Sequence, residues 1–182
     1  MDEAAQRSLV TRAQRGDASA FGELIRLTQA AVYHVCLRMM GERREAEDMA
    51  QETFVRVYER LHTFDPQRPF LPWVRRVAAN YCLNQLSRRA PVSTSFDDAS
   101  DWPEEAAGPL AQIEQAEQAR RVRAALLRLA PRQRAVVELR HFQELSYDEI
   151  AQALNLPISD VKSDLFRARR LLAEMLKDDP SN

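Results

Sequence analysis

The sequence has few of the residues on which most enzymes and metalloproteins depend. It contains four glycines, two cysteines and three histidines in 182 residues. The histidines are scattered, no serine or cysteine stands in a nucleophile motif, and no glycine-rich phosphate loop occurs, so we do not expect an enzyme. Cys36 and Cys82 lie in apolar helical patterns without a CxxC motif or a histidine at metal-ligand spacing. We expect them to be reduced core thiols, and we expect neither a metal nor a cofactor.

Long apolar runs are also missing. No stretch of 18 apolar residues occurs, and the opening Met1-Asp2-Glu3 is acidic where a secretory signal is basic. We therefore expect a cytoplasmic protein without membrane insertion. The 45% hydrophobic and 29% charged residues are typical of a globular protein. Few glycines and a strong 3.6-residue periodicity predict an all-α fold.

The net charge of −1 hides an uneven distribution. Residues 1–89 and 120–182 each carry a net charge of +3, whereas residues 90–119 carry −7. The acidic stretch is rich in Pro, Ser, Asp and Ala, as expected of a linker, and its charge serves either solubility or an imitation of nucleic acid. The sequence therefore predicts two small helical domains, 1–89 and 112–182, joined by an acidic flexible linker at 90–111.

Four helices are expected in the first domain. Their predicted ranges are about 3–15, 18–40, 44–61 and 72–89. On the third helix, Asp48, Gln51 and Glu52 share a face opposite the apolar stripe. Carboxylates one turn apart repel each other mildly in an isolated helix. This face is therefore either an unimportant solvated surface or a docking surface for a basic partner.

The fourth helix lies in FLPWVRRVAANYCLNQLSRR, which has four arginines and no acidic residue. Pro72 suits the first helical position, because the N–H that proline lacks would have no partner there. One face is apolar and packs, and the opposite face is polar and cationic. Trp73 lies at the border between the two faces. Taken alone, this pattern also fits an ordinary amphipathic surface helix.

A helix-turn-helix is expected in the second domain, after helices at about 112–129 and 131–142. Ser146 and Glu149 stand at capping-box spacing and begin a short helix that ends near Asn155. A longer helix begins near Ser159 and carries several lysines and arginines opposite an apolar stripe. A short helix, a tight turn and a basic second helix are typical of DNA binding.

Three motifs in this order around the acidic linker resemble those of a bacterial RNA polymerase sigma factor. They are EAEDMAQETFVRVY (45–58), FLPWVRRVAANYCLNQLSRR (70–89) and LAPRQRAVVELRHFQELSYDEIAQALNLPISDVKSDLFRARRLL (129–172). The resemblance is to the sigma-70 superfamily, extracytoplasmic-function (ECF) group. It implies that the first domain is sigma region 2 and the second is sigma region 4. Such a factor binds core RNA polymerase and directs it to promoters with defined −35 and −10 elements.

The resemblance also implies a role for each cluster of residues. Asp48, Gln51 and Glu52 would dock on the clamp helices of the polymerase largest subunit. The residues expected to recognise and melt the −10 element are Phe64, Trp73, Arg75, Arg76, Asn80, Asn84, Arg88 and Arg89. The residues expected at the −35 element are Lys162, Ser163, Asp164, Phe166, Arg167, Arg169 and Arg170. Further expected contacts are the polymerase flap, the RNA exit path for the linker, and a separate anti-sigma factor.

The chemistry of the residues agrees with these roles. Trp73 can stack on an extruded base, Asn80 and Asn84 can bond base edges, and the arginines suit phosphates. Opening about ten steps of duplex costs on the order of 14 kcal/mol, since each step is worth roughly 1.4 kcal/mol. Stacking returns only about 1–3 kcal/mol per captured base. We therefore expect a specificity subunit that melts DNA only together with polymerase.

Asp160 and Asp164 depart from the family pattern at the start of the recognition helix. A carboxylate at Asp160 suits the helix dipole, but Asp164 lies beyond the first turn. A carboxylate in the major groove can accept from the cytosine amino group. We therefore expect Asp164 either to read a cytosine or to reject the family's usual −35 sequence.

Two other kinds of protein are possible on the sequence alone. A stand-alone helix-turn-helix regulator would explain the second domain but would leave the acidic face and the acid-free helix without a purpose. It would bind a promoter duplex tightly without polymerase. A helical scaffold for protein partners would not explain the basic helix.

Overall fold

The computed structural model describes residues 3–89 and 109–177, so most of the predicted linker lies outside the described residues. All regular elements in these ranges are helical, which confirms the all-α fold. The elements are α1 (Glu3–Gln14), α2 (Ala18–Met40), α3 (Arg43–Arg60), the 3-10 turn η1 (Leu61–Thr63), α4 (Phe70–Arg88), α5 (Pro109–Leu127), α6 (Pro131–Val137), the π-helical turn η2 (Glu138–Phe142), α7 (Tyr147–Leu154) and α8 (Ile158–Lys177).

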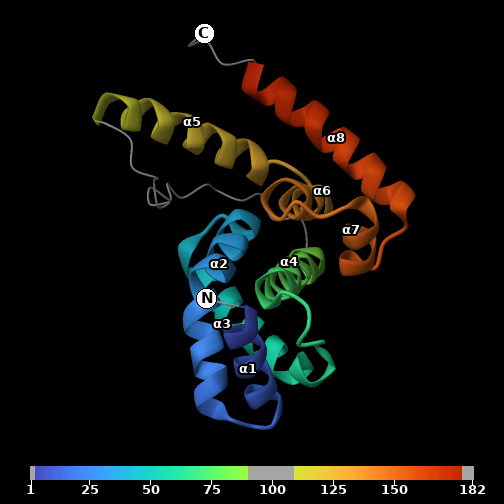
Figure 1. Cartoon of the computed structure of the whole chain (residues 1–182). Helices are drawn as coiled ribbons and strands as arrows, with labels where there is room; N and C mark the ends of the chain where they lie inside the picture. The colour runs from blue at the N-terminus through green and yellow to red at the C-terminus, as the bar shows by residue number, and fades with distance from the viewer. Residues whose placement is uncertain (1–2, 90–108, 178–182) are drawn as a thin grey trace.

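Helices α1 to α4 form the first module (Figure 1). Their ends follow local signals: Asp17 caps α2 by accepting from the backbone N–H groups of Ser19 and Ala20, and Gly41 ends it at φ 85°. The start of α4 differs from the prediction, because the helix begins at Phe70 and Pro72 falls within its first turn. A proline is tolerated there, since the first N–H groups of a helix have no intrahelical acceptor.

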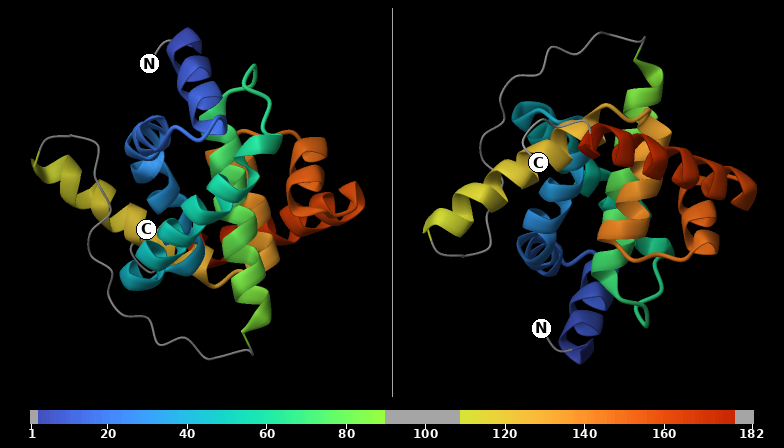
Figure 2. Two further views of the ribbon diagram at one scale, coloured as in Figure 1. Left: turned by 90° about the horizontal axis from the view of Figure 1, so that it is seen from below. Right: turned by 90° about the horizontal axis from the view of Figure 1, so that it is seen from above.

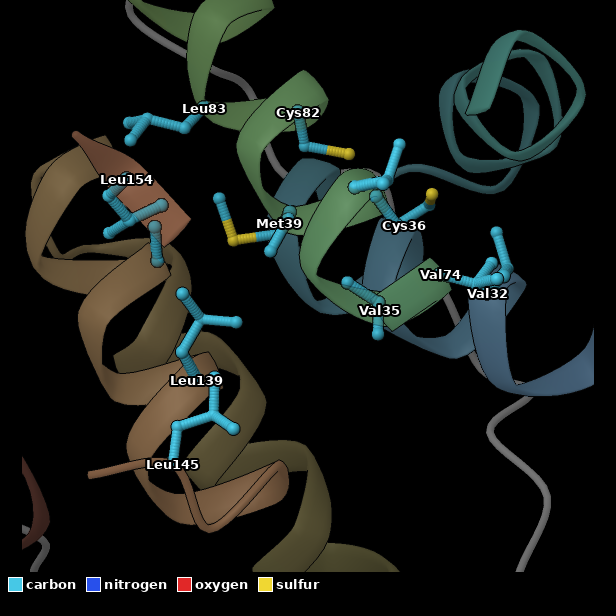
Figure 3. Close-up of a cluster of buried hydrophobic side chains, with 14 of the residues drawn as sticks. Val32, Val35, Cys36, Met39, Val74, Cys82, Leu83, Leu139, Leu145 and Leu154 are labelled. Carbon is cyan, nitrogen blue, oxygen red and sulfur yellow. The ribbon is translucent and has the colours of Figure 1, made fainter. Parts of the chain in front are cut away.

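The core of the first module lies between α2 and α4. Figure 3 shows Val32, Val35 and Cys36 of α2 beside Val74 and Cys82 of α4, and all five are fully buried. Both thiols are free, as predicted. A hydrogen bond with Cys36, together with burial, raises the pKa of the Cys82 thiol well above its usual value.

Helices α5 to α8 form the second module, which packs against α2 and α4 of the first (Figures 1 and 2). The apolar core continues across the boundary between the modules. In Figure 3, Met39 of α2 and Leu83 of α4 face the side where Leu139 of η2 and Leu154 of α7 lie. All four are at most 7% exposed. The two modules therefore share buried apolar surface.

Candidate nucleic-acid interface

The predicted docking face lies on the outer side of α3. Asp48, Gln51 and Glu52 are all exposed, as their helical spacing predicts. Val55 and Tyr58 continue the surface one and two turns further along and are 49% and 56% exposed. An acidic patch is thus followed by exposed apolar and aromatic surface. The sequence pattern did not single out Val55 or Tyr58, because exposure of large side chains on one helix depends on what the other helices cover.

A polar groove of about 260 Å³ runs between α3 and α4. Three residues predicted for −10 DNA, Asn80, Asn84 and Arg88, line it together. The groove also holds residues that the sequence reasoning missed: Arg56, Glu59, Arg60, Val77, Tyr81 and Gln85. Three guanidinium groups against one carboxylate give this groove an excess of positive charge.

Tyr81 adds an aromatic ring to the wall of the groove. The guanidinium carbon of Arg56 lies 5.5 Å from the centre of this ring, and Arg56 also bonds Glu59 at 3.2 Å. Rings and guanidinium planes are the surfaces on which unpaired bases stack. The sequence pointed to Tyr81 only through its place next to Asn80. The packing of α3 on α4 shows that both residues line one groove.

Trp73 belongs to an aromatic cluster at the start of α4. Its ring centre lies 4.7 Å from that of Phe64 and 5.7 Å from that of Phe70. Phe64 is only 6% exposed, so it lies in the core and not on the surface where we expected it to contact DNA. The hydrophobic packing of three rings explains the difference. Trp73 is half-buried and packs against the Phe64 ring.

Arg75 and Arg76 face the second module. Arg75 donates to the Gln143 side chain at 3.0 Å, and Arg76 donates to the Glu149 carboxylate at 3.0 Å. Burial, with the charge of Arg38 nearby, lowers the pKa of the Arg75 guanidinium. These two predicted DNA contacts are therefore engaged within the chain in this arrangement. Arg89, at the other end of α4, pairs with Glu45 at 2.7 Å.

A buried ion pair connects the modules beside Arg75. Arg38 donates from Nε and Nη2 to the two carboxylate oxygens of Glu138 at 2.6 and 2.8 Å. The Glu138 side chain is 2% exposed, and it also accepts from Gln143 at 3.0 Å. The Phe142 ring lies 4.4 Å from the Arg38 guanidinium carbon. The π-helical turn η2 thus places Glu138 and Phe142 on the same arginine.

The helix-turn-helix forms as predicted from α7 and α8. The Ser146 hydroxyl accepts from the Glu149 N–H, and Glu149 accepts in turn from the Ser146 N–H, which completes the capping box. Asn155 ends α7 at φ 52°, a conformation that asparagine tolerates. The hydrogen bond that the Glu149 carboxylate accepts from the Ser146 backbone N–H lowers the pKa of Glu149, followed by the bond from the Ser146 hydroxyl and the charge of Arg76. A network of backbone and side-chain bonds thus fixes the start of α7.

The outer face of α8 carries six of the seven residues predicted for the −35 element. Those exposed are Lys162, Ser163, Phe166, Arg167, Arg169 and Arg170. Phe166 is 69% exposed, the highest exposed fraction among the large hydrophobic side chains of the described residues. The arrangement presents cations and one apolar ring on a single basic helix.

Asp164 is the exception, and the prediction that it faces a base is wrong for this arrangement. Its side chain is 4% exposed, and its Oδ2 accepts from Arg132 Nε at 2.6 Å. Asp164 shares the buried face of α8 with Val161, Leu165 and Ala168. The spacing i, i+3, i+4, i+7 already places Asp164 on the apolar stripe. We nevertheless expected it to face outward, because a buried carboxylate needs a partner and the sequence did not show that Arg132 lies beside it.

The described residues lack two further features, a group of metal ligands and a membrane-spanning helix. In residues 3–89 and 109–177, no group of three or more His, Cys, Asp or Glu side chains is placed to hold a metal ion. None of the helices within the same ranges has both the length and the apolar character needed to cross a membrane.

Two family models match the chain. The model "Sigma-70 region 2" matches residues 24–91, and "Sigma-70, region 4" matches residues 119–172. The first contains the α3 face and the α3–α4 groove, and the second contains the helix-turn-helix. The order and position of the two matches are those expected from the sequence motifs.

Full-length relatives are similar over nearly the whole chain. The ECF RNA polymerase sigma factor SigW of Bacillus subtilis (strain 168) is 31% identical over 180 residues, covering 93% of this chain and 95% of the relative. The RNA polymerase sigma-H factor of Pseudomonas aeruginosa is 33% identical over 182 residues, covering 94% and 93%.

Solved structures show the same fold. CnrH in complex with the cytosolic domain of CnrY has a TM-score of 0.64 at 27% identity, covering 96% of this chain and 99% of that one. The sigma factor RpoE in complex with the anti-sigma factor NepR, from Bartonella quintana, has a TM-score of 0.65 at 21% identity, covering 87% and 98%. The likeness extends over both modules.

Proposed function

The chain belongs to the extracytoplasmic-function group of RNA polymerase sigma factors, and from that premise we propose how its surfaces divide the work of promoter recognition. As a sigma factor, it binds core RNA polymerase and directs it to specific promoters. The assignment of residues rests on one observation: three surfaces of different chemistry follow one another along the chain. They are the acidic face of α3, the α3–α4 groove and the exposed side of α8. Each offers the chemistry that one step requires.

The α3 face is the polymerase docking surface in this proposal. Asp48 and Glu52 supply charge against a basic partner, and Gln51 supplies a neutral donor and acceptor. Val55 and Tyr58 add apolar surface that becomes buried on docking, and burial of an aromatic side chain is a common source of affinity. The partner is the clamp-helix region of the largest subunit.

The α3–α4 groove holds the non-template strand of the −10 element. Asn80 and Asn84 bond the edges of extruded bases, Tyr81 or Trp73 stacks on them, and Arg56, Arg60 and Arg88 neutralise phosphates. Arg75 and Arg76 reach DNA only after they leave Gln143 and Glu149. Recognition of the −10 element by these two arginines therefore requires the two modules to separate.

The outer face of α8 reads the −35 element in the major groove. Lys162 and Ser163 lie near the start of the helix, where base contacts are made in this motif. Phe166 can contact a thymine methyl, and the remaining basic residues, Arg167, Arg169 and Arg170, position the helix on phosphates. Region 4 also meets the polymerase flap.

Further partners and the location follow from the family. Both solved relatives described above are complexes, one of them with a protein named as an anti-sigma factor. We propose that a separate anti-sigma factor also regulates this chain, that the chain works in the cytoplasm beside polymerase, and that it performs no catalysis of its own.

The experiment that tests the proposed function is reconstitution with core polymerase. The purified chain should support run-off transcription from a subset of a randomised promoter library, with defined sequences at −35 and −10, and should not bind promoter duplex tightly alone. Tight and specific binding without polymerase would instead indicate a stand-alone regulator.

Docking is tested by matched charge reversals on α3. Asp48→Lys should greatly weaken holoenzyme assembly, whereas Glu47→Lys, an exposed neighbour on the same helix, should leave it near the wild-type level. Circular dichroism checks that both variants keep their helical content. Equal co-purification of the two variants with core polymerase would contradict the assignment of this face.

A further inference from the structure

The pairing of Arg132 with two aspartates links α6 to the start of α8. Arg132 donates from Nε to Asp164 Oδ2 at 2.6 Å and from Nη2 to Oδ1 at 3.4 Å. Its Nη1 lies 3.6 Å from Oδ2 of Asp160. The Asp164 side chain is 4% exposed, while those of Asp160 and Arg132 are 41% and 45% exposed. One guanidinium thus bridges two successive turns of α8.

The place of these turns matters for reading DNA. Lys162, Ser163 and Phe166 are interleaved with Asp160 and Asp164 along the helix and point to the outside. The first turns of a recognition helix are the part that contacts base edges. The Arg132 bridge therefore holds the inner side of the same two turns whose outer side meets DNA.

The helix that carries Arg132 is itself held in place. Arg134, two residues further on, is 8% exposed and donates to the carbonyls of Leu126, Leu127 and Leu129 and to that of Met39. These bonds tie α6 to the end of α5 and to α2. Arg132 therefore extends from a fixed base.

An ion pair of this kind constrains the orientation of a helix more than it increases the stability of the fold. Apolar contacts do not depend on angle, and a buried ion pair replaced by well-packed apolar residues is often no less stable. A guanidinium that meets a carboxylate through two N–H groups, by contrast, constrains both distance and orientation. The distinctive effect of burying Asp164 beside Arg132 is thus to set the angle at which α8 packs against α6.

We propose that Arg132, Asp160 and Asp164 are positioning residues that fix the angle of the recognition helix, so that they sharpen −35 reading without touching a base. This inference rests on the proposed function of α8. It replaces the expectation that Asp164 reads a cytosine with a role through Lys162, Ser163 and Phe166.

The test is a selection from promoters randomised at −35 and −10, using holoenzyme reconstituted with each variant. Asp164→Asn keeps the shape but removes the charge, and Arg132→Ala removes the bridge. Both should weaken the preference for the selected base at every −35 position. The combined preference for the −35 element should fall by about tenfold, roughly the value of one good base contact. The −10 preferences should stay unchanged. Arg132→Lys keeps the charge but lacks the planar fork, so it should give an intermediate loss.

Two controls separate positioning from general loss of stability. Glu174→Gln breaks the exposed Arg170–Glu174 pair on the same helix, and Ile150→Val trims a fully buried side chain of α7. Both should keep sharp −35 preferences, measured well below the melting temperature of each variant. A loss of −35 preference in Ile150→Val equal to that in Asp164→Asn would overturn the proposal.

The remaining outcomes are also decisive. If Asp164→Asn changes the preferred base at one position and leaves the others sharp, Asp164 reads DNA directly and the proposal is wrong. If Asp164→Asn and Arg132→Lys both leave all preferences unchanged, the bridge is only structural. A wild-type holoenzyme that selects no −35 sequence would overturn the proposed function, and this inference with it.

Discussion

Individual side chains in this structure take their roles from what surrounds them. Arg134 is buried among carbonyl groups, and burial lowers its pKa to about 10. Arg132, only two residues away, meets carboxylates, and its hydrogen bond to Asp164 raises its pKa. One arginine therefore fastens backbone segments to each other, while the other orients a helix. Asn80 differs from both because it lines an open groove.

Asn80 is the first residue on which a prediction depends. Asn80→Ala leaves a base edge without its partner, which typically costs about 1–3 kcal/mol, or about 5- to 150-fold. Open-complex formation should fall by that factor while binding of core polymerase persists, as measured by permanganate footprinting and co-purification. Ser87→Ala, exposed on the same helix, should have no effect. Unchanged footprints in Asn80→Ala would show that the groove does not hold the melted strand.

Asp17 gives a prediction about pH. Backbone bonding from Ala20, then bonds from Ser19 and Arg12, lower its pKa from 3.8 to about 2. The charged form therefore stabilises the fold above about pH 3.8, and this contribution is lost as the pH falls to about 2. Asp17→Asn should destabilise the chain at neutral pH, and the difference from wild type should shrink within that window, as followed by urea unfolding.

A second variant separates the causes at Asp17. Arg12→Gln removes the bond and the charge of Arg12, each of which lowers the pKa of Asp17 by less than the bond from Ala20 or from Ser19, so a carboxyl titration by NMR should show a pKa raised in part and still below 3.8. A return to the full ordinary value would show that Arg12, and not the helix N-terminus, controls this group.

Helix ends show how far elements are set by local sequence and how far by their neighbours. Gly16 and Gly41 both adopt positive φ, 90° and 85°. A Cβ on Gly16 would meet nothing within 4 Å, but one on Gly41 would lie 2.7 Å from Leu127 Cδ2 of α5. Glycine is therefore required at position 16 only by the backbone conformation. At position 41 it is required also by the close contact with Leu127 of the second module.

The two glycines make a matched pair of substitutions. Gly16→Ala should lower the free energy of unfolding by about 1–2 kcal/mol, the cost of a left-handed residue with a Cβ. Gly41→Ala should lower it by more, because Leu127 must also move. Thermal and urea unfolding of both variants measure the difference, and equal losses would show that the contact between α2 and α5 is not held in solution.

The same contrast explains what could be predicted from the sequence. Ser146 and Asn155 were placed correctly because capping and left-handed turns are local. The predicted range 18–40 agrees with α2, whose ends the structure shows to be capped locally by Asp17 and Gly41. The start of α4 was two residues off, because Phe70 is held in the helix by its packing against Phe64 and Trp73.

The candidate site was less predictable where it depends on contacts distant in sequence. Asp164 was expected to face DNA because its partner, Arg132, lies on another helix 32 positions earlier. Arg75 and Arg76 were expected to be available, but their partners Gln143 and Glu149 belong to the other module. Periodicity gives the faces of a helix and does not tell which faces are covered.

At the scale of the whole molecule, polar and apolar contacts hold the modules together. Glu138 and Glu149 of the second module meet Arg38 and Arg76 of the first. The pair at Glu138 is buried, whereas the pair at Glu149 is partly exposed and worth little. The buried pair is therefore the contact whose loss should separate the modules.

Glu138→Gln tests this relation. Loss of one partner from a buried ion pair typically costs about 3–5 kcal/mol, because the other charge stays buried. The variant should show a larger radius of gyration by X-ray scattering and tighter binding of the free chain to fork-junction −10 DNA. Glu23→Gln, which breaks the exposed pair with Arg26, should change neither. Unchanged scattering for Glu138→Gln would mean that apolar contacts alone hold the modules.

The apolar surface shared between the modules has a consequence for the lifetime of the chain. Met39, Leu83, Leu139 and Leu154 belong to the apolar core that continues across the boundary between the modules, so separation of the modules would uncover part of this surface unless another protein covered it. A chain that opens away from its partners would expose these side chains to chaperones and proteases, which act on such surfaces. The concentration of free sigma factor would then depend on how often its modules separate while no partner is bound. Degradation would in that way limit transcription from its promoters.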